Sequence, residues 1–279
     1  MLPMNWNTAI GYANLVAIAE SVAPSGAYGQ AQIDQIQADG FTFLQTLYGD
    51  ELATDIDPHV GEVVSFGFLA LSASKELVAA IRGTDTIMEW LHDASFLMTP
   101  CPIAGAHGYT EDGFTAVYRS LRIGQANTAL AAKDSIKSYL DTGAATNVAV
   151  CGHSLGGALA TLLTLDVALN TSCNAPVGYT YASPRVGDHI FAGSYNAMVS
   201  ASYRIANRQD LVPKLPPILP LPYEHVNTIY ELNPPPDKIN PTISCMHHLT
   251  TYLWLMSQLS GSAGYPLDAD CVSTGPMKV

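Results

Sequence analysis

The sequence predicts an α/β fold with a central, mostly parallel sheet flanked by helices. Short apolar segments of strand character alternate along the chain with longer segments of helical periodicity, and such alternation is typical of parallel sheets covered on both faces. The length of 279 residues allows a large buried core. Because α/β folds of this size often form one domain, we expect a single domain over residues 1–279.

Hydrophobic periodicity and turn residues define the expected elements. Helices are expected at 5–22, 112–140, 155–170, 189–199 and 249–259. Strands are expected at 60–71, 76–82, 147–151, 177–182, 203–206 and 223–232. The segment 213–222 contains five prolines, which exclude a helix or a central strand. It is also apolar, so we expect a rigid loop that packs on the protein or lines a pocket.

Composition limits the possible partners. Charged residues make up 13% of the chain and the formal net charge is −12. Without a cluster of Lys and Arg, nucleic acids, anionic membranes and phosphorylated substrates are disfavoured. No run of 18 apolar residues exists to span a bilayer. Met1–Ile10 carries no basic region typical of a signal peptide, although a mature protein with its signal removed would look the same.

Cysteine usage argues against a metal site. The five cysteines are an odd number, so at least one is unpaired or paired between chains. Cys151 lies in a strand pattern and is expected to be a buried free thiol. Neither Cys-x-x-Cys nor Cys/His ligand spacing occurs, so a zinc site is not expected.

The sharpest chemical signal is Gly152-His153-Ser154-Leu155-Gly156. An apolar strand runs into this Gly-x-Ser-x-Gly motif and a helical pattern follows, which is the context of a nucleophile elbow. The glycines allow the strand and helix to approach closely. The Ser154 hydroxyl would then lie beside a helix N-terminus, where an oxyanion is stabilised. The alternative, a glycine-rich helix start without chemistry, is rejected.

An acid and a histidine should follow Ser154 in the chain, because this is their order in such folds. Asp210 follows an expected strand and enters a loop, so it is preferred as the acid. Asp188 is better explained as a helix N-cap, and Asp166 lies within a helix as a solvated or locally paired charge.

The later histidines are His189, His225, His247 and His248. His153 is excluded because its place in the elbow points it away from the serine hydroxyl. His247 and His248 both begin the final helix, and only one of them can face Ser154.

Several segments together resemble the class 3 lipases, a family that includes filamentous-fungal lipases and feruloyl esterases. The elbow Gly152–Ala158 resembles the signature of that family. Four further segments match it in order, namely Ile81–Thr86 with Trp90 and Asp93, Tyr181–Asp188, Tyr203–Pro213 and His247–Leu253. Two departures are Ala182 in place of a usual glycine and Glu111-Asp112-Gly113-Phe114 where the family often has His-x-Gly-Phe. Any role carried over from that histidine is therefore not assigned to His107.

The resemblance implies a Ser-His-Asp triad without a metal or an organic cofactor. It implies Ser154, Asp210 and a C-terminal histidine as the triad. The spacing to Tyr252 in plant and bacterial members favours His247, whereas the fungal pattern favours His248, and we prefer His247. The resemblance also implies an oxyanion hole formed by the backbone N–H of Leu155 and by the backbone N–H and hydroxyl of Thr84.

A helical lid is expected over about residues 86–99. In the family that this chain resembles, a mobile helix follows the oxyanion residue. Ile87, Trp90 and Leu91 would form one apolar stripe of this helix, which could cover the site in water or contact a lipid surface. The alternative is an ordinary core helix.

The expected function is a lipase or carboxylesterase that hydrolyses acylglycerol esters, such as those presented at a lipid–water interface. A feruloyl esterase acting on plant cell-wall esters is the alternative enzyme. A catalytically silent protein that binds an apolar ligand or a partner protein is the alternative of another class, and the intact triad candidates disfavour it. Secretion is expected because lipid-facing hydrolases are often exported.

Overall fold

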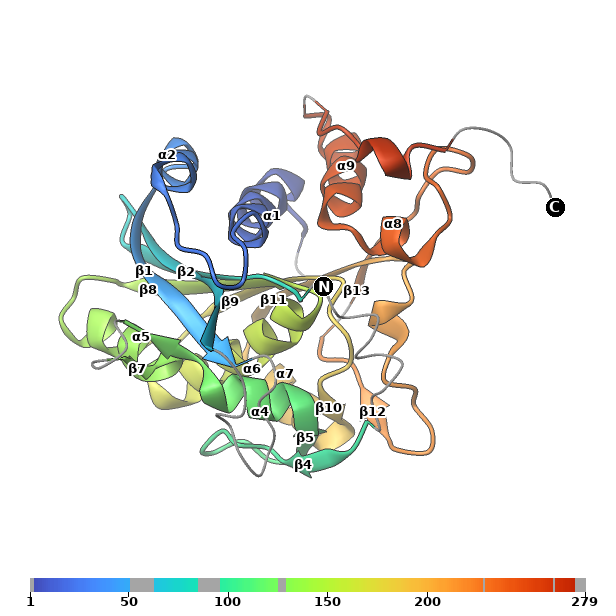
Figure 1. The fold of residues 1–279 in the computed structure, drawn as a ribbon. Helices are drawn as coiled ribbons and strands as arrows, with labels where there is room; N and C mark the ends of the chain where they lie inside the picture. The colour runs from blue at the N-terminus through green and yellow to red at the C-terminus, as the bar shows by residue number, and fades with distance from the viewer. Residues whose placement is uncertain are drawn as a thin grey trace.

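A mixed β-sheet lies at the centre of the molecule, with helices on both faces (Figure 1). The computed structural model describes residues 3–50, 63–84, 96–124, 129–227, 229–262 and 264–273. Within these ranges the central sheet consists of β1 (Phe41–Asp50), β2 (Val63–Ser72), β3 (Glu76–Ile81), β6 (Arg122–Ile123), β7 (Leu130–Ala131), β8 (Asn147–His153), β9 (Val177–Tyr181), β11 (Ala201–Asn207) and β13 (Ile229–Leu232). Their order is β13-β11-β9-β8-β3-β2-β1-β6-β7.

The strand directions divide this sheet into two halves. The pairings from β3 through β8, β9 and β11 to β13 are parallel. The pairings from β3 through β2 and β1 to β6 and β7 are antiparallel. The parallel half ends in the loops that carry the candidate site, as expected where the carboxyl ends of parallel strands meet at one edge.

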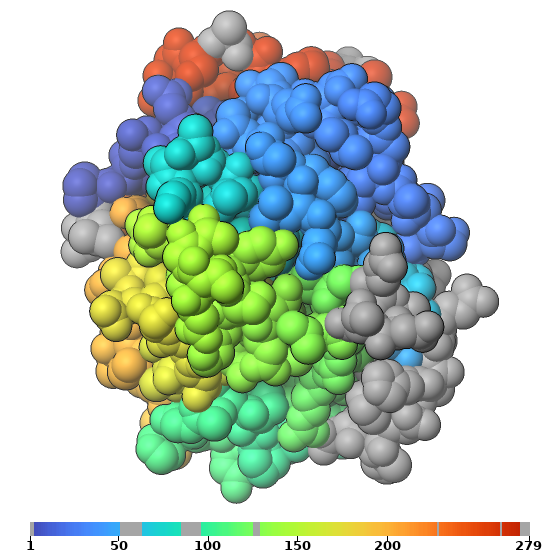
Figure 2. All heavy atoms as spheres, turned by 90° about the vertical axis from the view of Figure 1, so that its left-hand side faces the viewer, coloured from blue at the N-terminus to red at the C-terminus, as the bar shows by residue number. Residues whose placement is uncertain are grey.

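The helices form a layer on each face of the sheet (Figure 1). One layer consists of α1 (Trp6–Glu20), α2 (Gln30–Ala38) and α9 (Leu249–Ser260), and the short helix α8 (Ile243–His247) precedes α9. The other consists of α4 (Asp112–Ser120), α5 (Ala132–Asp141), α6 (Leu155–Asn170) and α7 (His189–Met198). In the side view of Figure 2 the α2 and β1 segment, in blue, lies above the α5 segment, in light green.

Strand β8 shows how the sequence produces the two layers. Val148 and Val150 belong to the core beneath α4, α5 and α6, whereas Ala149 and Cys151 belong to the core beneath α1 and α9. Successive residues of a strand point to opposite faces, so a strand buried on both faces has a continuous apolar run. The apolar run of residues 148–151 therefore encodes a central strand.

A second, four-stranded sheet lies outside the α4–α7 layer (Figure 1). Among the described residues its order is β12 (Tyr223–Glu224), β10 (Gly187–Asp188), β5 (Tyr109–Glu111) and β4 (Met98–Pro100). The expected strand at 223–232 is therefore wrong as one element, because residues 223–224 and 229–232 belong to different sheets. Asn227, with φ +49°, lies between the two strands.

The expected helix at 112–140 is also wrong as a single element. Helix α4 ends at Ser120, and Arg122–Ile123 pairs with β1, where Leu47 lies opposite Ile123. Gly124 then adopts φ +116°, a conformation that interrupts a helix and favours glycine. The helical pattern resumes in α5. The other expected helices and strands are confirmed with shifts of a few residues at their ends, whereas α2 and β1 were not predicted.

The expected lid falls partly outside the described residues. Ile87, Trp90 and Leu91 lie in the segment 85–95, which the structure does not describe. The end of the expected lid is corrected, because Met98 and Thr99 belong to strand β4 and pair with β5. Thr99 is buried there.

The cysteines include one disulfide, between Cys245 and Cys271. Cys151 is buried and free, as predicted, and Cys101 and Cys173 are free as well. Burial raises the pKa of the Cys151 thiol above its usual value. Across the described ranges, no helix is long and apolar enough to cross a membrane, and no group of three or more His, Cys, Asp or Glu side chains could hold a metal ion.

Candidate active site

Ser154 occupies the tight turn between strand β8 and helix α6. Its backbone adopts φ +57° and ψ −125°, a left-handed conformation that is strained for a residue with a side chain. The flanking glycines permit this turn. A Cβ on Gly152 would lie 2.1 Å from the carbonyl oxygen of Gly156, and a Cβ on Gly156 would lie 2.4 Å from the carbonyl oxygens of Ile81 and Arg82. The strand, turn and helix can therefore approach only because both residues lack a side chain.

The structure brings Ser154, His247 and Asp210 into one hydrogen-bonded chain. Nε2 of His247 lies 2.8 Å from Oγ of Ser154, and Nδ1 of His247 lies 2.8 Å from Oδ2 of Asp210. Asp210 has no exposed surface, and its Oδ1 accepts a hydrogen bond from the backbone N–H of Val212. A carboxylate on Nδ1 leaves Nε2 free to accept a proton from the hydroxyl, which is the arrangement of a serine nucleophile with its general base.

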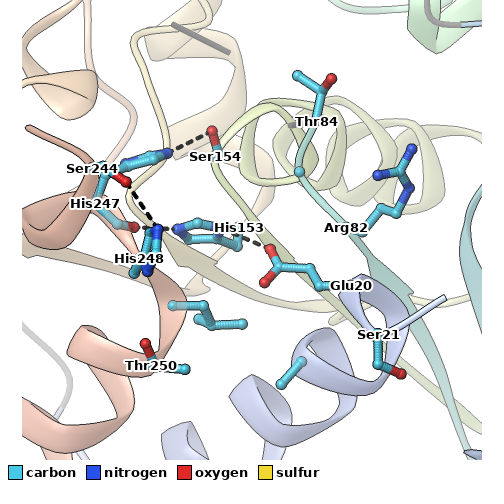
Figure 3. Close-up of a pocket in the computed structure, with 13 residues that line it drawn as sticks. Glu20, Ser21, Arg82, Thr84, His153, Ser154, Ser244, His247, His248 and Thr250 are labelled. Atoms are coloured by element: carbon cyan, nitrogen blue, oxygen red, sulfur yellow. Dashed lines mark hydrogen bonds and ion pairs between the residues drawn. The ribbon is translucent and has the colours of Figure 1, made fainter. Parts of the chain in front are cut away.

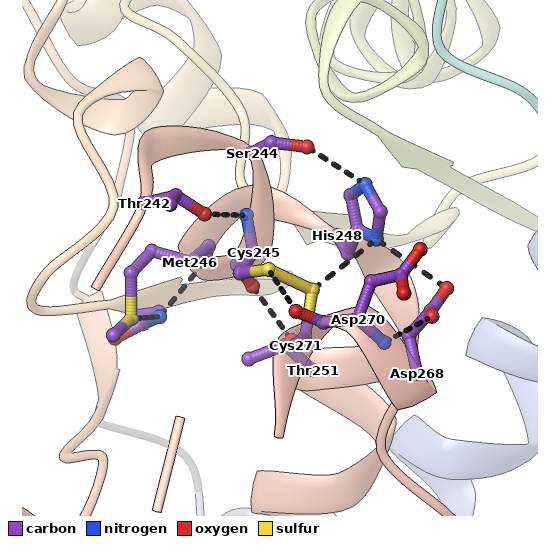
Figure 4. The surroundings of a disulfide bond; sticks show 10 residues. Thr242, Ser244, Cys245, Met246, His248, Thr251, Asp268, Asp270 and Cys271 are labelled. Atoms are coloured by element: carbon purple, nitrogen blue, oxygen red, sulfur yellow. Dashed lines mark hydrogen bonds and ion pairs between the residues drawn. A yellow bond between two sulfur atoms is a disulfide. The ribbon is translucent and has the colours of Figure 1, made fainter. Parts of the chain in front are cut away.

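The segments that carry the acid and the histidine are tied together. Asp210 follows strand β11, and His247 is the last residue of α8. The side-chain amide of Asn207, at the end of β11, donates a hydrogen bond to the carbonyl of Met246. The disulfide from Cys245 holds the same turn to the C-terminal segment at Cys271 (Figure 4). These contacts fix the backbone next to His247 from two sides.

The environment keeps the His247 imidazole neutral at neutral pH. Burial lowers the pKa of His247, and this effect outweighs the hydrogen bond and the negative charge of Asp210, which raise it. A neutral imidazole is the form that can accept the serine proton.

His248 points away from Ser154. Its side chain is 43% exposed, and its Nε2 lies 3.0 Å from Oγ of Ser244. Helix α8 ends at His247 and α9 begins at Leu249, so His248 lies at the junction between two helices and the two imidazoles diverge. Of the two histidines that the sequence left open, His247 is therefore the one that contacts Ser154.

The other candidates have structural environments. Asp188 caps helix α7, as predicted, by accepting a hydrogen bond from the backbone N–H of Phe191. Asp166 is buried and accepts a hydrogen bond from the hydroxyl of Tyr118, so it is locally paired rather than solvated. Nε2 of His225 lies 2.6 Å from the carbonyl oxygen of Pro213.

Thr84 and Leu155, the two residues expected to form an oxyanion hole, both lie near Ser154. Thr84 follows β3 and lines the same pocket as Ser154 and His247. A Cβ on the preceding Gly83 would lie 3.1 Å from Cβ of Ser154, so this strand end passes close to the nucleophile. Leu155 is the first residue of α6, and backbone N–H groups in a first helical turn lack acceptors within the helix.

Comparison with known proteins identifies the family. Residues 78–219, which are 142 of the 279 residues, match the family described as Lipase (class 3). The chain belongs to the class 3 lipase family.

Relatives of this lipase-family chain come from fungi and plants. It is 31% identical over 174 residues to secreted mono- and diacylglycerol lipase 1 of Fusarium solani, and the aligned region covers 62% of this chain and 49% of the relative. It is 30% identical over 213 residues to phospholipase A1-II 4 of Oryza sativa subsp. japonica, and this aligned region covers 68% of this chain and 54% of the relative. The chain thus spans about half the length of the curated relatives it matches.

Solved lipase structures share the fold. A nonglycosylated lipase of Yarrowia lipolytica aligns with a TM-score of 0.63 and 23% identity, over 86% of this chain and 82% of that one. The MDLA protein of Penicillium cyclopium aligns with a TM-score of 0.62 and 24% identity, over 85% and 83%. The fold is accordingly the α/β-hydrolase fold that the sequence predicted.

Ser154 and His247 line a pocket of about 480 Å³ (Figure 3). Besides the expected residues, this pocket is lined by Glu20, from the end of α1, and by His153. Nδ1 of His153 lies 2.8 Å from Oε1 of Glu20, and Nε2 of His153 lies 2.8 Å from the carbonyl oxygen of His247. Sequence reasoning excluded His153 as the base and did not consider Glu20, because nothing local to residue 20 marks it as part of a site formed more than 100 residues later.

Proposed function

We propose that this class 3 lipase-family protein hydrolyses carboxylic esters of acylglycerols, with Ser154 as nucleophile, His247 as general base and Asp210 as the acid that orients it. The observation that carries the proposal is the pair of 2.8 Å contacts that link Ser154, which lines the pocket, through His247 to the buried Asp210.

The reaction follows from this geometry. Nε2 of His247 accepts the proton of the Ser154 hydroxyl as Oγ attacks the ester carbonyl carbon. The resulting oxyanion is stabilised by backbone N–H groups of Leu155 and Thr84. The imidazolium then donates its proton to the departing alcohol, and an acyl-enzyme remains. Water, deprotonated by His247, attacks this ester and releases the fatty acid and Ser154. The reaction requires neither a metal nor an organic cofactor.

Charge supports a neutral acylglycerol over a phospholipid as the substrate, although relatives are named for both classes. The whole chain carries a formal charge of −12, which would repel a phosphate group. A preference for phosphatidylcholine over tributyrin would contradict this assignment, and a preference for methyl ferulate would favour the feruloyl esterase.

Site-directed variants test the catalytic assignment. Ser154→Ala should lower kcat on tributyrin by a factor on the order of 10⁶. His247→Ala should cost about as much, whereas His248→Ala serves as the matched control and should retain most of the activity. Labelling of wild type by an organophosphonate, but not of Ser154→Ala, would identify the nucleophile directly. Absence of labelling in wild type would instead favour the silent, ligand-binding protein.

The lid proposal concerns Ile87, Trp90 and Leu91. Tributyrin hydrolysis should rise sharply where the substrate exceeds its solubility, because an apolar lid helix gains an apolar surface only at an interface. Replacing Trp90 with Ser should flatten this rise, with the rate on dissolved substrate retained. A smooth saturation curve in wild type would contradict a lid.

We also propose that the protein acts outside the cell. The Cys245–Cys271 disulfide supports this, because disulfides persist in oxidising compartments. The relative from Fusarium solani is named as secreted. Thiol counting on unreduced, unfolded protein from its natural source should find Cys101, Cys151 and Cys173 reactive, and reactivity of Cys245 and Cys271 would contradict the proposal.

A further inference from the structure

Both ring nitrogens of His153 face hydrogen-bond acceptors. Nδ1 lies 2.8 Å from the carboxylate of Glu20, and Nε2 lies 2.8 Å from the backbone carbonyl oxygen of His247 (Figure 3). A neutral imidazole has one N–H group and can satisfy only one of these acceptors, whereas an imidazolium can donate to both. With Glu20 ionised, the geometry therefore favours a protonated His153 that has the Glu20 carboxylate as its counter-ion.

Glu20 stands at a position that is unfavourable for a carboxylate. It is the last residue of helix α1, and no basic residue occupies the last turn of that helix. The negative end of a helix dipole destabilises a nearby carboxylate. This cost is offset by the contact with His153 and by a hydrogen bond from the backbone N–H of Gly83, which precedes the oxyanion candidate Thr84. Glu20 thus joins three segments at the pocket. A local conflict of this kind, a carboxylate at a helix C-terminus, is typical of functional sites.

His153 also packs directly against the base. The ring centroids of His153 and His247 are 4.8 Å apart, with an angle of 32° between the ring planes. The hydrogen bond from His153 to the carbonyl oxygen of His247 fixes the backbone of His247, while Asp210 fixes the His247 ring. His153 itself has 6% of its surface exposed, so it has little freedom to move away.

The electrostatics are consistent with a charged pair. Burial lowers the pKa of His153, but the charge and hydrogen bond of Glu20 outweigh it and leave the pKa raised. Burial raises the pKa of Glu20, but the charge and hydrogen bond of His153 outweigh it and leave the pKa lowered.

Several groups act on the base itself. Burial has the largest effect on the pKa of His247 and lowers it, and the hydrogen bond and charge of Asp210 raise it. The charge of His153 lowers this pKa, and the charge of Glu20 raises it by a smaller amount. Tyr252, on α9, stays neutral because burial and then Asp210 raise its pKa well above the usual value. Arg82 and His248 also line the pocket.

We propose that Glu20 and His153 form a positioning pair for the catalytic base, in which the Glu20 carboxylate holds the His153 imidazolium so that it binds the His247 backbone carbonyl and stacks on the His247 ring. Neither residue touches the reacting atoms, so both act through His247. This inference rests on the proposed ester hydrolysis, because it assigns His247 the role of base.

The test uses Glu20→Gln, which keeps a side-chain oxygen as acceptor but removes the charge. With a neutral His153, the pKa of His247 should rise, since the lost charge of His153 affects it more than the lost charge of Glu20. The acid limb of kcat/KM on 4-nitrophenyl butyrate should therefore move to higher pH. We expect kcat at neutral pH to fall by roughly 10- to 100-fold from misplacement of the base, with KM nearly unchanged and partial recovery in Glu20→Asp.

Tyr12→Phe is the matched control. The Tyr12 hydroxyl donates a hydrogen bond to Glu76 and also ties α1 to the sheet, but it lies outside the pocket. If Glu20 merely anchored the helix, the two variants would show similar losses of thermal stability and the same pH profile as wild type. That result, or an unchanged kcat and pH profile in Glu20→Gln, would overturn the positioning role.

NMR separates this inference from the proposed function. The ring ¹⁵N shifts of His153 should report an imidazolium at neutral pH in wild type and a neutral ring in Glu20→Gln, whether or not the protein hydrolyses esters. A neutral His153 in wild type would overturn the pair. An unlabelled Ser154 together with an imidazolium at His153 would overturn the proposed hydrolysis while leaving the ion pair intact.

Discussion

The hydroxyl of Tyr252 lies 2.8 Å from Oδ2 of Asp210, the same carboxylate oxygen that Nδ1 of His247 contacts at 2.8 Å. The Tyr252 oxygen also accepts a hydrogen bond from the backbone N–H of Asn207, at the end of β11. All of these groups are buried. Helix α9 therefore contributes one hydroxyl to the site, which helps to fix the orientation of Asp210, the carboxylate that His247 contacts.

Tyr252→Phe should impair both folding and catalysis. The substitution removes a hydrogen bond to a fully buried carboxylate and leaves the N–H of Asn207 without its acceptor, which should cost about 1–3 kcal/mol of unfolding free energy. A less constrained Asp210 should lower kcat by roughly tenfold. Thermal melts and kcat on tributyrin measure the two effects.

The control for this prediction is Tyr195→Phe. The Tyr195 hydroxyl is also buried and lies 3.0 Å from Oγ of Ser202, away from the pocket. This variant should lose stability but keep its kcat. Equal losses of kcat in the two variants would refute a specific role for Tyr252.

The pH dependence of hydrolysis should reflect the lowered pKa of His247. Burial holds this pKa below the ordinary histidine value of about 6.5. The reactive form is the neutral imidazole, so lowering the pKa extends activity to more acidic pH. The acid limb of kcat/KM should have its midpoint below 6.5, with circular dichroism confirming that the protein stays folded there. A midpoint above 6.5 would contradict the buried, neutral base.

Loss of the disulfide should loosen the segment that carries the base. Cys245 and Cys271 are 26 residues apart in sequence, and closing a loop of this size typically stabilises a protein by about 2–4 kcal/mol. Cys271→Ser should therefore lower the unfolding temperature, and activity should be lost at a lower temperature than in wild type. Cys101→Ser, which removes a free thiol, should leave both unchanged. Similar behaviour of the two variants would show that the disulfide does not brace the site.

The sequence predicted the strand, turn and helix around Ser154 well because their signal is local. The apolar strand, the glycines of the elbow and the helix after Ser154 are contiguous, and helix α6 has the predicted bounds. The choice between His247 and His248 depended on the break between α8 and α9. The sequence did not reveal this break, because the residues around it read as one continuous apolar helix. The structure resolves the contact, while the catalytic role of His247 stays a prediction.

Elements defined by distant partners were not predictable in this way. The helix expected at 112–140 is interrupted because residues 122–123 pair with β1, a strand that the sequence did not reveal. Glu20 lies 133 residues from His153 in the chain, and its carboxylate at the end of a helix has the pattern of an ordinary surface charge. Only the docking of α1 on the sheet brings it to the pocket.

Glu111, which stands near where the family often has a histidine, should destabilise the protein as the pH rises. Its carboxylate caps α4 by accepting a hydrogen bond from the backbone N–H of Phe114, yet burial raises its pKa to about 7. Between the ordinary glutamate value of about 4.3 and this raised value, the folded state binds more protons than the unfolded state, so stability falls as the pH increases.

Glu111→Gln keeps an acceptor for the cap and removes this titration. The variant should match wild type in unfolding free energy at pH 4 and exceed it at pH 8 by up to about 3 kcal/mol, as urea denaturation at the two pH values would measure. Asp134→Asn is the control, because this half-exposed carboxylate in the first turn of α5 contacts Lys133; it should gain no stability over wild type between pH 4 and pH 8. Equal stability of Glu111→Gln and wild type at both pH values would mean that the buried carboxylate pays no ionisation penalty.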